Sequence, residues 1–278
     1  MASAAALSLA ALVLANCGRD APDSVANNAQ TEAPVATKAP VMPVALTPPQ
    51  ALTRGDLVSA AGQAASAYAE GKVPSAADPL VGRSFAVRLP FGCDGPAPAE
   101  AVAGEGDGLA TWTWGPDRTT IQLRMAPSNW AGSAMLAKAG TSDQWEAVEG
   151  FWTPRPWLAS ERCPAVQVDP SQTGVPPASP QTVGLAAVFE QGGSRLGRRN
   201  GRPYEHTLRA KGDAPLTPPE GGFRMLLEGR IASFPNGRAI ECRASGPDQR
   251  PICIVAIQLD RVAYEDAGGS VLSEWRPG

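Results

Sequence analysis

Apolar side chains recur at every second position near residue 85 of this 278-residue chain. Phe85, Val87, Leu89 and Phe91 fall on one face of an extended segment, and Arg88 falls on the other. This period of two predicts a half-buried β-strand. Further strands are expected at Thr111–Trp114, Thr120–Met125, Trp145–Trp152, Val183–Glu190, Phe223–Ser233, Arg238–Ala244, Pro251–Tyr264 and Val271–Trp275. Most of the folded chain is therefore predicted to be β-sheet.

The long strand Pro251–Tyr264 changes phase along its length. Cys253, Val255 and Ile257 share one face, whereas Tyr264 lies on the opposite parity. A β-bulge near Asp260–Arg261 would return all of them to one side, because one extra residue shifts the alternation by one. Long bent strands of this kind suit a small barrel or a curled sheet.

Two turns are predicted from short polar motifs. Gly115-Pro116-Asp117-Arg118 separates two of the expected strands and is typical of a turn. Asn236-Gly237 precedes Arg238–Ala244 and predicts a type I′ hairpin, because both of its positions need positive φ.

One helix is predicted ahead of the strands. Thr53 and Asp56 have the spacing of a capping box, apolar residues then recur at helical spacing as far as Tyr68, and Gly71 ends the pattern. A second, short helix is a weaker prediction at Ala131–Ala139. The predicted fold class is mainly β with a minor α+β character. It consists of an N-terminal helix followed by antiparallel sheets, arranged as two small β units or barrels or as one β sandwich.

The first residues form a different kind of segment. The apolar run Met1–Ala15 is shorter than the roughly 20 residues that span a bilayer, and it runs into Leu14-Ala15-Asn16-Cys17. This motif resembles the lipobox of bacterial lipoproteins. The resemblance implies a signal peptide over residues 1–16 and a Cys17 that carries diacylglycerol and an acylated amino group. Gly18 stands where the family's inner-membrane retention signal has Asp, which implies an anchor in the outer membrane.

Two inner segments, Arg83–Cys93 and Phe151–Trp157, resemble those of uncharacterised proteobacterial envelope lipoproteins. Together the resemblances imply a location in the bacterial cell envelope. The lipid would anchor the protein in the outer membrane, and the folded part would lie in the periplasm. The resemblances imply no activity and no cofactor.

Proline divides the rest of the chain. Residues 18–50 are rich in proline and contain no aromatic residue, so they cannot build a core. We therefore expect lipidated Cys17 and a disordered tether over residues 17–52. A helix and a Trp-rich β unit are expected at 53–168, a proline-rich linker at 169–182 and a C-terminal β unit at 183–278.

Four cysteines remain when Cys17 is assigned to lipid. An even set in an exported protein is typical of disulfides, and four cysteines allow three pairings. Cys242 and Cys253 flank a turn between two expected strands, so we predict that they staple a hairpin. Cys93 and Cys163 then pair by elimination. No pair has the spacing of zinc ligands, and we expect no structural metal.

Charge and motifs exclude several classes of function. The net charge is −3, which gives no global field for nucleic acid. The loop 104–108 lacks the full ligand set of an EF-hand calcium site. His206 has no nucleophile motif nearby, so no catalytic residue is assigned. A hydrolase of envelope material that uses His206 and carboxylates is kept as an alternative.

Tryptophan is concentrated in one half of the chain. Trp112, Trp114, Trp130, Trp145, Trp152 and Trp157 all lie within this half. Exposed rings could stack on sugars or prolines, and Trp152 and Trp157 are the candidates in the densest piece. The favoured interpretation is that the tryptophans fill the core, because large apolar side chains are normally buried.

Arginines gather in a glycine-rich segment. Arg195, Arg198, Arg199 and Arg202 are the candidate ligand-binding residues, with Glu205 as the only nearby carboxylate in the sequence. The planar guanidinium group binds phosphate or carboxylate bidentately, so lipopolysaccharide, anionic lipid and peptidoglycan are plausible partners. A solvated charged loop is the equally weighted alternative.

Three hypotheses follow for function. The first is a noncatalytic envelope lipoprotein that binds an anionic or glycan component of the envelope. The second is the His206 hydrolase. The third is a structural partner in an envelope protein assembly.

Overall fold

A computed structural model describes residues 49–72, 78–98, 106–137, 139, 145–164, 180–210, 212 and 215–276. The predictions for the signal peptide, for Cys17, for the tether up to residue 48 and for the linker between 169 and 179 lie outside these residues. In the described part of the chain, no helix has both the length and the apolar character needed to cross a membrane.

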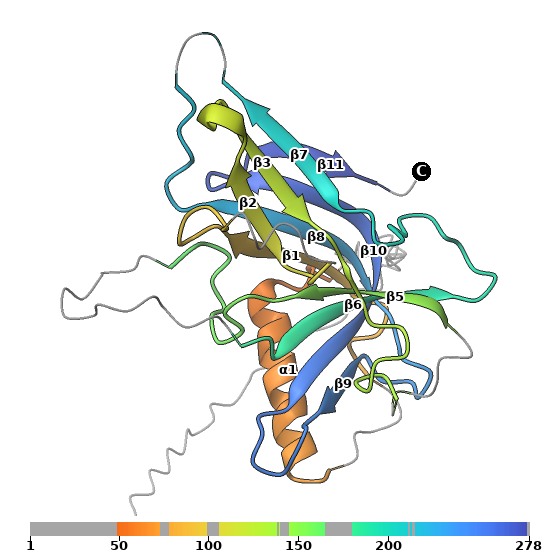
Figure 1. Cartoon of the computed structure of the whole chain (residues 1–278). Coiled ribbons are helices and arrows are strands. Elements are labelled where there is room, and N and C mark those ends of the chain that lie inside the picture. Colours follow the sequence, from red (N-terminus) through yellow and green to blue (C-terminus); the bar gives the residue numbers. More distant parts are fainter. Residues whose placement is uncertain are drawn as a thin grey trace, which may run out of the picture. The chain divides into compact units, whose positions relative to one another are not determined.

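The described strands form two sheets, and one long helix packs beside them (Figure 1). The helix is α1 (Arg54–Ala69), and a short 3-10 turn, η2, covers Pro116–Arg118. The larger sheet has the order β1 (Ser84–Phe91), β8 (Phe223–Ile231), β10 (Ile252–Asp266), β6 (Val183–Glu190), β5 (Trp145–Trp152), β4 (Ser128–Asn129), with β9 (Ile240–Arg243) and β11 (Val271–Trp275) also paired to β10. The smaller sheet has the order β2 (Ala110–Trp114), β3 (Thr120–Met125), β7 (Tyr204–Arg209). The prediction of a mainly β fold with one N-terminal helix is confirmed.

Strand β10 is central to the larger sheet, because it pairs with four other strands, two along its first half and two along its second half. Its first half lies between β6 and β9, and its second half lies between β8 and β11. The register against β8 shifts between Leu259 and Arg261, at the site of the predicted bulge. Cys253 and Tyr264 consequently belong to one apolar cluster despite their opposite parity.

One face of the larger sheet carries the main core. Alternate residues of β1, β8, β10 and β6 pack there against α1 and against the inner face of the smaller sheet. The opposite face of β5, β6 and the start of β10 packs against Trp130, Leu136 and Phe234. Burial on both faces explains the nearly continuous apolar sequence of β6, which alternation alone does not predict.

Helix α1 begins and ends where the sequence indicates. The Thr53 hydroxyl accepts the Asp56 N–H at 3.4 Å, and the Asp56 carboxylate accepts the Thr53 N–H at 2.8 Å, which completes the capping box. Gly71 follows the helix at φ 67°. The helix buries Leu57 and Ala61 against the sheet.

Several local expectations differ from the structure. Strand β6 runs parallel to β10, so the larger sheet is mixed rather than purely antiparallel. Asn236-Gly237 does not form a type I′ hairpin: of the two, only Gly237 has positive φ, and β9 pairs with β10 rather than with β8. The described residues of 131–139 form turns instead of a helix. No strand was expected at residues 204–209, which form β7.

The larger sheet also crosses the expected domain boundary. Strand β1 pairs with β8, and β5 pairs with β6, so segments 53–168 and 183–278 share one sheet. Pro48–Gly278 form one compact unit. The strands do not close into a barrel in the described part of the chain.

Both expected disulfides are present. Cys242 and Cys253 lie directly opposite each other on β9 and β10, with Cα atoms 4.1 Å apart. Cys93 and Cys163 join the end of β1 to the segment after β5, across 70 residues of sequence. The second disulfide therefore fixes a segment that has no strand of its own.

Candidate functional site

The four candidate arginines lie on residues 195–203, here called the basic segment, which connects β6 to β7. Two carboxylates of β5 hold this segment in place. The Glu146 carboxylate accepts a hydrogen bond from the Arg195 guanidinium at 2.7 Å and also forms an ion pair with Arg198. Glu205, the nearest carboxylate in the sequence, pairs instead with Arg124 on β3 at 3.3 Å. The carboxylates that neutralise these arginines thus lie about fifty residues earlier in the chain, and no sequence motif indicates this pairing.

Glu149 anchors the centre of the basic segment. Its carboxylate accepts the backbone N–H of Arg199 at 2.9 and 3.1 Å and that of Asn200 at 2.8 Å. Glu149 is 6% exposed. Burial raises its pKa, and the two backbone hydrogen bonds oppose that rise. The segment is therefore built onto the sheet rather than solvated as a free loop.

Arg199 and Arg202 hold each other through the backbone. The Arg199 guanidinium donates to the carbonyl oxygens of Arg202 at 3.2 Å and Pro203 at 2.6 Å, and Arg202 donates to the Arg199 carbonyl at 3.3 Å. The Arg199 guanidinium also lies 4.7 Å from the centroid of the Tyr204 ring. Among the described residues, neither arginine has a carboxylate bonded to its side chain. Arg199 is consequently a structural cation, whereas the exposed Arg202 is available to a ligand.

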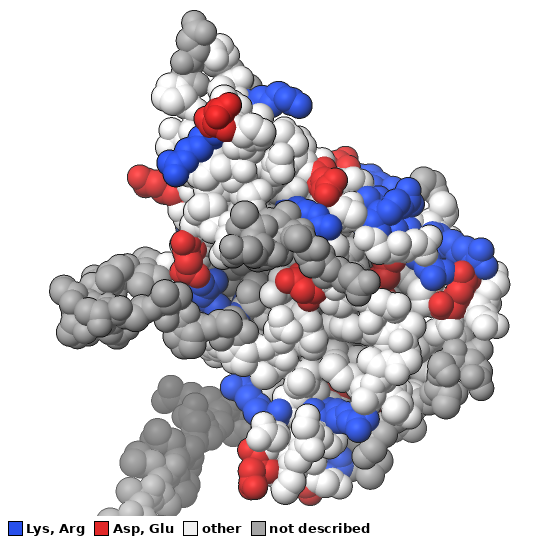
Figure 2. Space-filling model, viewed as in Figure 1, with Lys and Arg blue, Asp and Glu red and all other residues white. Residues whose placement is uncertain are grey.

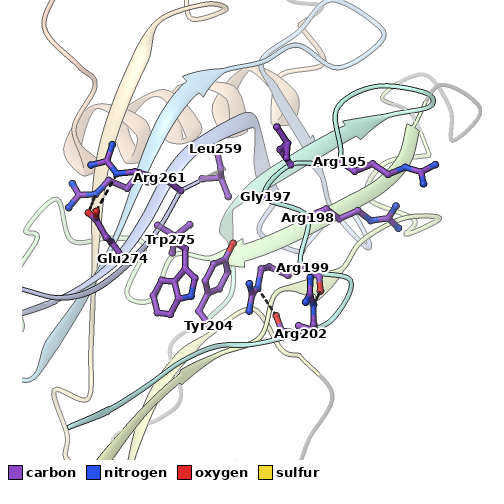
Figure 3. A pocket seen from close by; sticks show the side chains of 13 residues that line it. Arg195, Gly197, Arg198, Arg199, Arg202, Tyr204, Leu259, Arg261, Glu274 and Trp275 are labelled. Atoms are coloured by element: carbon purple, nitrogen blue, oxygen red, sulfur yellow. Dashed lines mark hydrogen bonds and ion pairs between the residues drawn. The ribbon is translucent and has the colours of Figure 1, made fainter. Parts of the chain in front are cut away.

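A groove of about 470 Å³ opens beside the basic segment (Figure 3). One wall carries the four arginines of the segment, and the other wall comes from the bulge region of β10 and the end of β11. Figure 3 shows the rings of Tyr204 and Trp275 between the two walls. The lining residues include Arg195, Leu196, Arg198, Arg199, Arg202, Tyr204, Arg261, Glu274, Trp275 and Arg276.

The two walls differ in charge balance. On the far wall, Arg261 pairs with Glu228 at 3.0 Å and with Glu274 at 2.8 Å, and Arg276 pairs with Glu274 at 3.3 Å. Two arginines there face two glutamates. On the near wall, the only carboxylates that the four arginines contact among the described residues are Glu146 and the backbone-bound Glu149. In the space-filling view, basic surface gathers over the segment between β6 and β7 (Figure 2). Excess positive charge is therefore concentrated on one wall.

The aromatic floor of the groove was not predicted. The rings of Tyr204 and Trp275 meet edge to face with centroids 5.1 Å apart, and Trp275 also contacts Tyr264 at 5.4 Å. Tyr204 lies on β7 and Trp275 on β11, so the two sheets meet at this point. The alternation of Tyr204, His206 and Leu208 was a usable signal for β7, but the neighbouring glycines and arginines favoured a loop.

The tryptophan-rich half does not present a row of exposed rings. Trp112, Trp130 and Trp152 are buried, and the rings of Trp130 and Trp152 pack at 4.7 Å. Trp152 thus has no face open to a ligand. Trp157 is 54% exposed on the segment after β5, outside the groove.

His206 lies on β7, with its side chain among Thr111, Gln122, Arg124 and Glu205 in a smaller hollow of about 190 Å³. Burial lowers its pKa, which favours the neutral imidazole. No hydrogen bond joins His206 to a serine, a cysteine or a carboxylate among the residues that the structure describes. In that same part of the chain, no three His, Cys, Asp or Glu side chains gather as metal ligands. The described contacts of His206 therefore add no support to the hydrolase hypothesis.

No protein-family model, no curated protein and no solved structure matches this chain. The resemblance to envelope lipoproteins accordingly stays a prediction from the sequence.

Proposed function

We propose that this protein is a noncatalytic lipoprotein of the bacterial cell envelope that binds an anionic envelope component in the groove beside the basic segment. The observation that supports binding is the uneven charge of the groove, with four arginines on a wall that Glu146 and Glu149 hold in a fixed shape. A fixed wall loses little conformational entropy when a ligand binds.

Cys17 supplies the proposed location. Several acyl chains on one cysteine hold a protein at a membrane stably, whereas a single chain is marginal at about 0.8 kcal/mol per buried CH₂. Lipopolysaccharide and peptidoglycan are the anionic partners within reach of an outer-membrane anchor. The intact mass of protein extracted from membranes tests this part: native chain should carry the acyl mass and lack residues 1–16, and the Cys17→Ser variant should carry no acyl group.

Retention on envelope material tests binding. We expect the full chain to be retained on lipopolysaccharide or peptidoglycan, and the double variant Arg195→Gln/Arg202→Gln to elute at lower salt. Arg209→Gln/Arg250→Gln removes the same charge from exposed positions outside the groove and serves as the matched control. Equal retention of the two double variants would mean that net charge, and not the groove, is responsible.

A further inference from the structure

Arg202 is the clearest free cation of the groove. It is exposed, and only its Nε atom donates to another described residue, the carbonyl oxygen of Arg199. Arg195 likewise uses Nε for Glu146 and keeps both terminal nitrogens free of described partners. Each guanidinium has five N–H donors and no acceptor. The wall therefore offers more donors than the protein's own acceptors use, which suits a ligand group with several oxygens.

The floor of the groove suits a ring rather than an acyl chain. Tyr204 is 2% exposed and packs against the Arg199 guanidinium, so Trp275 is the ring that a ligand can reach, and it combines an apolar indole with one N–H group. Such side chains bind surfaces that are apolar in one part and hydrogen-bonding in another. A pyranose sugar has both, because its C–H groups pack on an aromatic face and its hydroxyl groups lie at its edge. A volume of about 470 Å³ also falls within the range of small-ligand sites, roughly 300–1,000 Å³.

The charge difference between the walls fixes the orientation of the ligand. On the far wall, Glu228 and Glu274 neutralise the charges of Arg261 and Arg276. An anionic group of the ligand placed on this wall would be repelled by the carboxylate of Glu274. Only the wall with Arg195 and Arg202 carries excess positive charge. The ligand accordingly needs one anionic end and one neutral end.

We infer that the groove binds a glycosyl phosphate, with the phosphate on Arg202 and the sugar ring on Trp275. This inference rests on the proposed function and names its ligand class. The same chemistry occurs in a free sugar phosphate and in one linked to lipid or polysaccharide. Leu196, 57% exposed beside the arginines, is positioned to contact an apolar carrier if the sugar is lipid-linked.

Calorimetric titration of the full chain tests the ligand class directly. The probes are N-acetylglucosamine 1-phosphate, N-acetylglucosamine and inorganic phosphate, followed by vesicles that contain lipopolysaccharide. We expect the sugar phosphate to bind at least about tenfold more tightly than either of its parts, because one charge-assisted hydrogen bond is worth about that factor. Tighter binding to the vesicles than to the free sugar phosphate identifies the lipid-linked source.

Single variants assign the two contacts. Arg202→Gln should weaken sugar phosphate binding about tenfold, and Arg209→Gln, at the end of β7 and outside the groove, should leave it unchanged. Trp275→Leu should weaken it, Trp275→Phe should restore part of the loss, and the exposed Trp157→Leu should have no effect. Thermal unfolding of each variant separates lost contacts from lost folding.

Four results would overturn the inference. Equal affinity for N-acetylglucosamine and its phosphate would remove the phosphate contact, and equal affinity for inorganic phosphate would remove the sugar contact. If lipopolysaccharide or peptidoglycan binds in an Arg202-dependent way while the sugar phosphate does not bind at all, the proposed function stands and the ligand class is wrong. If no anionic envelope component binds, both are wrong.

Discussion

The buried carboxylate of Glu149 accepts the backbone N–H of Arg199 through both of its oxygens, at 2.9 and 3.1 Å. The next N–H, of Asn200, donates to the same carboxylate at 2.8 Å, and Asn200 has φ 51°. Two successive N–H groups thus form a small concave anion site, and the protein fills it with its own side chain. Glu149 sets the shape of the basic segment, and through it the near wall of the groove.

Replacing Glu149 by Ala should loosen the basic segment. Two N–H groups lose their acceptor, and we expect the free energy of unfolding to fall by about 2 kcal/mol. Hydrogen exchange at Arg199 and Asn200 should become faster, while exchange in β8 changes only in proportion to global stability. Glu220→Ala removes an exposed carboxylate and is the control. Unchanged exchange at Arg199 and Asn200 would show that other contacts hold the segment.

The raised pKa of Glu149 predicts the sign of a pH effect. Burial raises this pKa in the folded state, so the folded protein binds the proton more tightly than the unfolded chain does. The corresponding stability is fully present below the ordinary pKa of a glutamate, and it is lost as pH rises through the raised value. The nearby cations of Arg198 and Arg199 oppose the shift.

Denaturant unfolding of the native chain and of Glu149→Gln, measured at a series of pH values, tests this effect. Other carboxyls shift in the opposite direction, since hydrogen bonds hold the pKa of Asp56 low and Arg276 and Arg261 hold that of Glu274 low. The useful quantity is therefore the difference in free energy of unfolding between native chain and variant. That difference should decrease as pH rises from the ordinary glutamate pKa, and an increase would contradict the assignment.

Substitution of the buried Arg54 should lower the stability of the protein strongly. It is 1% exposed, and its guanidinium donates to the carbonyl oxygens of Pro154 at 2.6 Å, Leu158 at 3.0 Å and Arg155 at 3.0 Å. Burial lowers its pKa to about 10, so it stays charged at neutral pH. These bonds tie the start of α1 to the segment that follows β5.

Arg54→Met leaves three carbonyl groups without this donor, and we expect it to lower the free energy of unfolding by about 3 kcal/mol. Arg54→Lys should recover only part of the loss, because an ammonium group cannot reproduce the planar fork. The exposed Arg250→Met should change stability by no more than about 0.5 kcal/mol. Coincident urea midpoints for Arg54→Met and native chain would refute the structural role.

Features set by neighbouring residues could be predicted from the sequence. The capping box of Thr53 and Asp56, the strand Ser84–Phe91 and the bulge before Arg261 all follow from spacing within one element. The pairing of Cys242 with Cys253 follows from a turn between adjacent strands. Local periodicity is enough in each case, because the determining contacts are close in sequence.

Features set by distant residues could not be predicted. The order of strands around β10 and the parallel pairing of β6 depend on packing between segments far apart in the chain. Glu146 and Glu149 lie about fifty residues before the basic segment, and only the folding of the sheet places both against it. Trp275 stands alone near the C-terminus in the sequence and meets Tyr204 only through the meeting of two sheets.

Substitution by alanine should change stability in opposite directions at two glycines. Gly229 pairs with Leu259 beside the bulge of β10, and a Cβ atom on Gly229 would lie 2.0 Å from the carbonyl oxygen of Gln258. That atom belongs to the backbone, so the bulge itself has to move, and we expect Gly229→Ala to destabilise the protein by about 2 kcal/mol. A Cβ on Gly62, within α1, would meet no atom within 4 Å, and Gly62→Ala should stabilise by up to about 1 kcal/mol. Urea unfolding of the two variants should move the midpoint in opposite directions at a similar slope. If Gly229→Ala were neutral, the bulge would be able to shift along β10, and the far wall of the groove, which includes Arg261, would not be fixed.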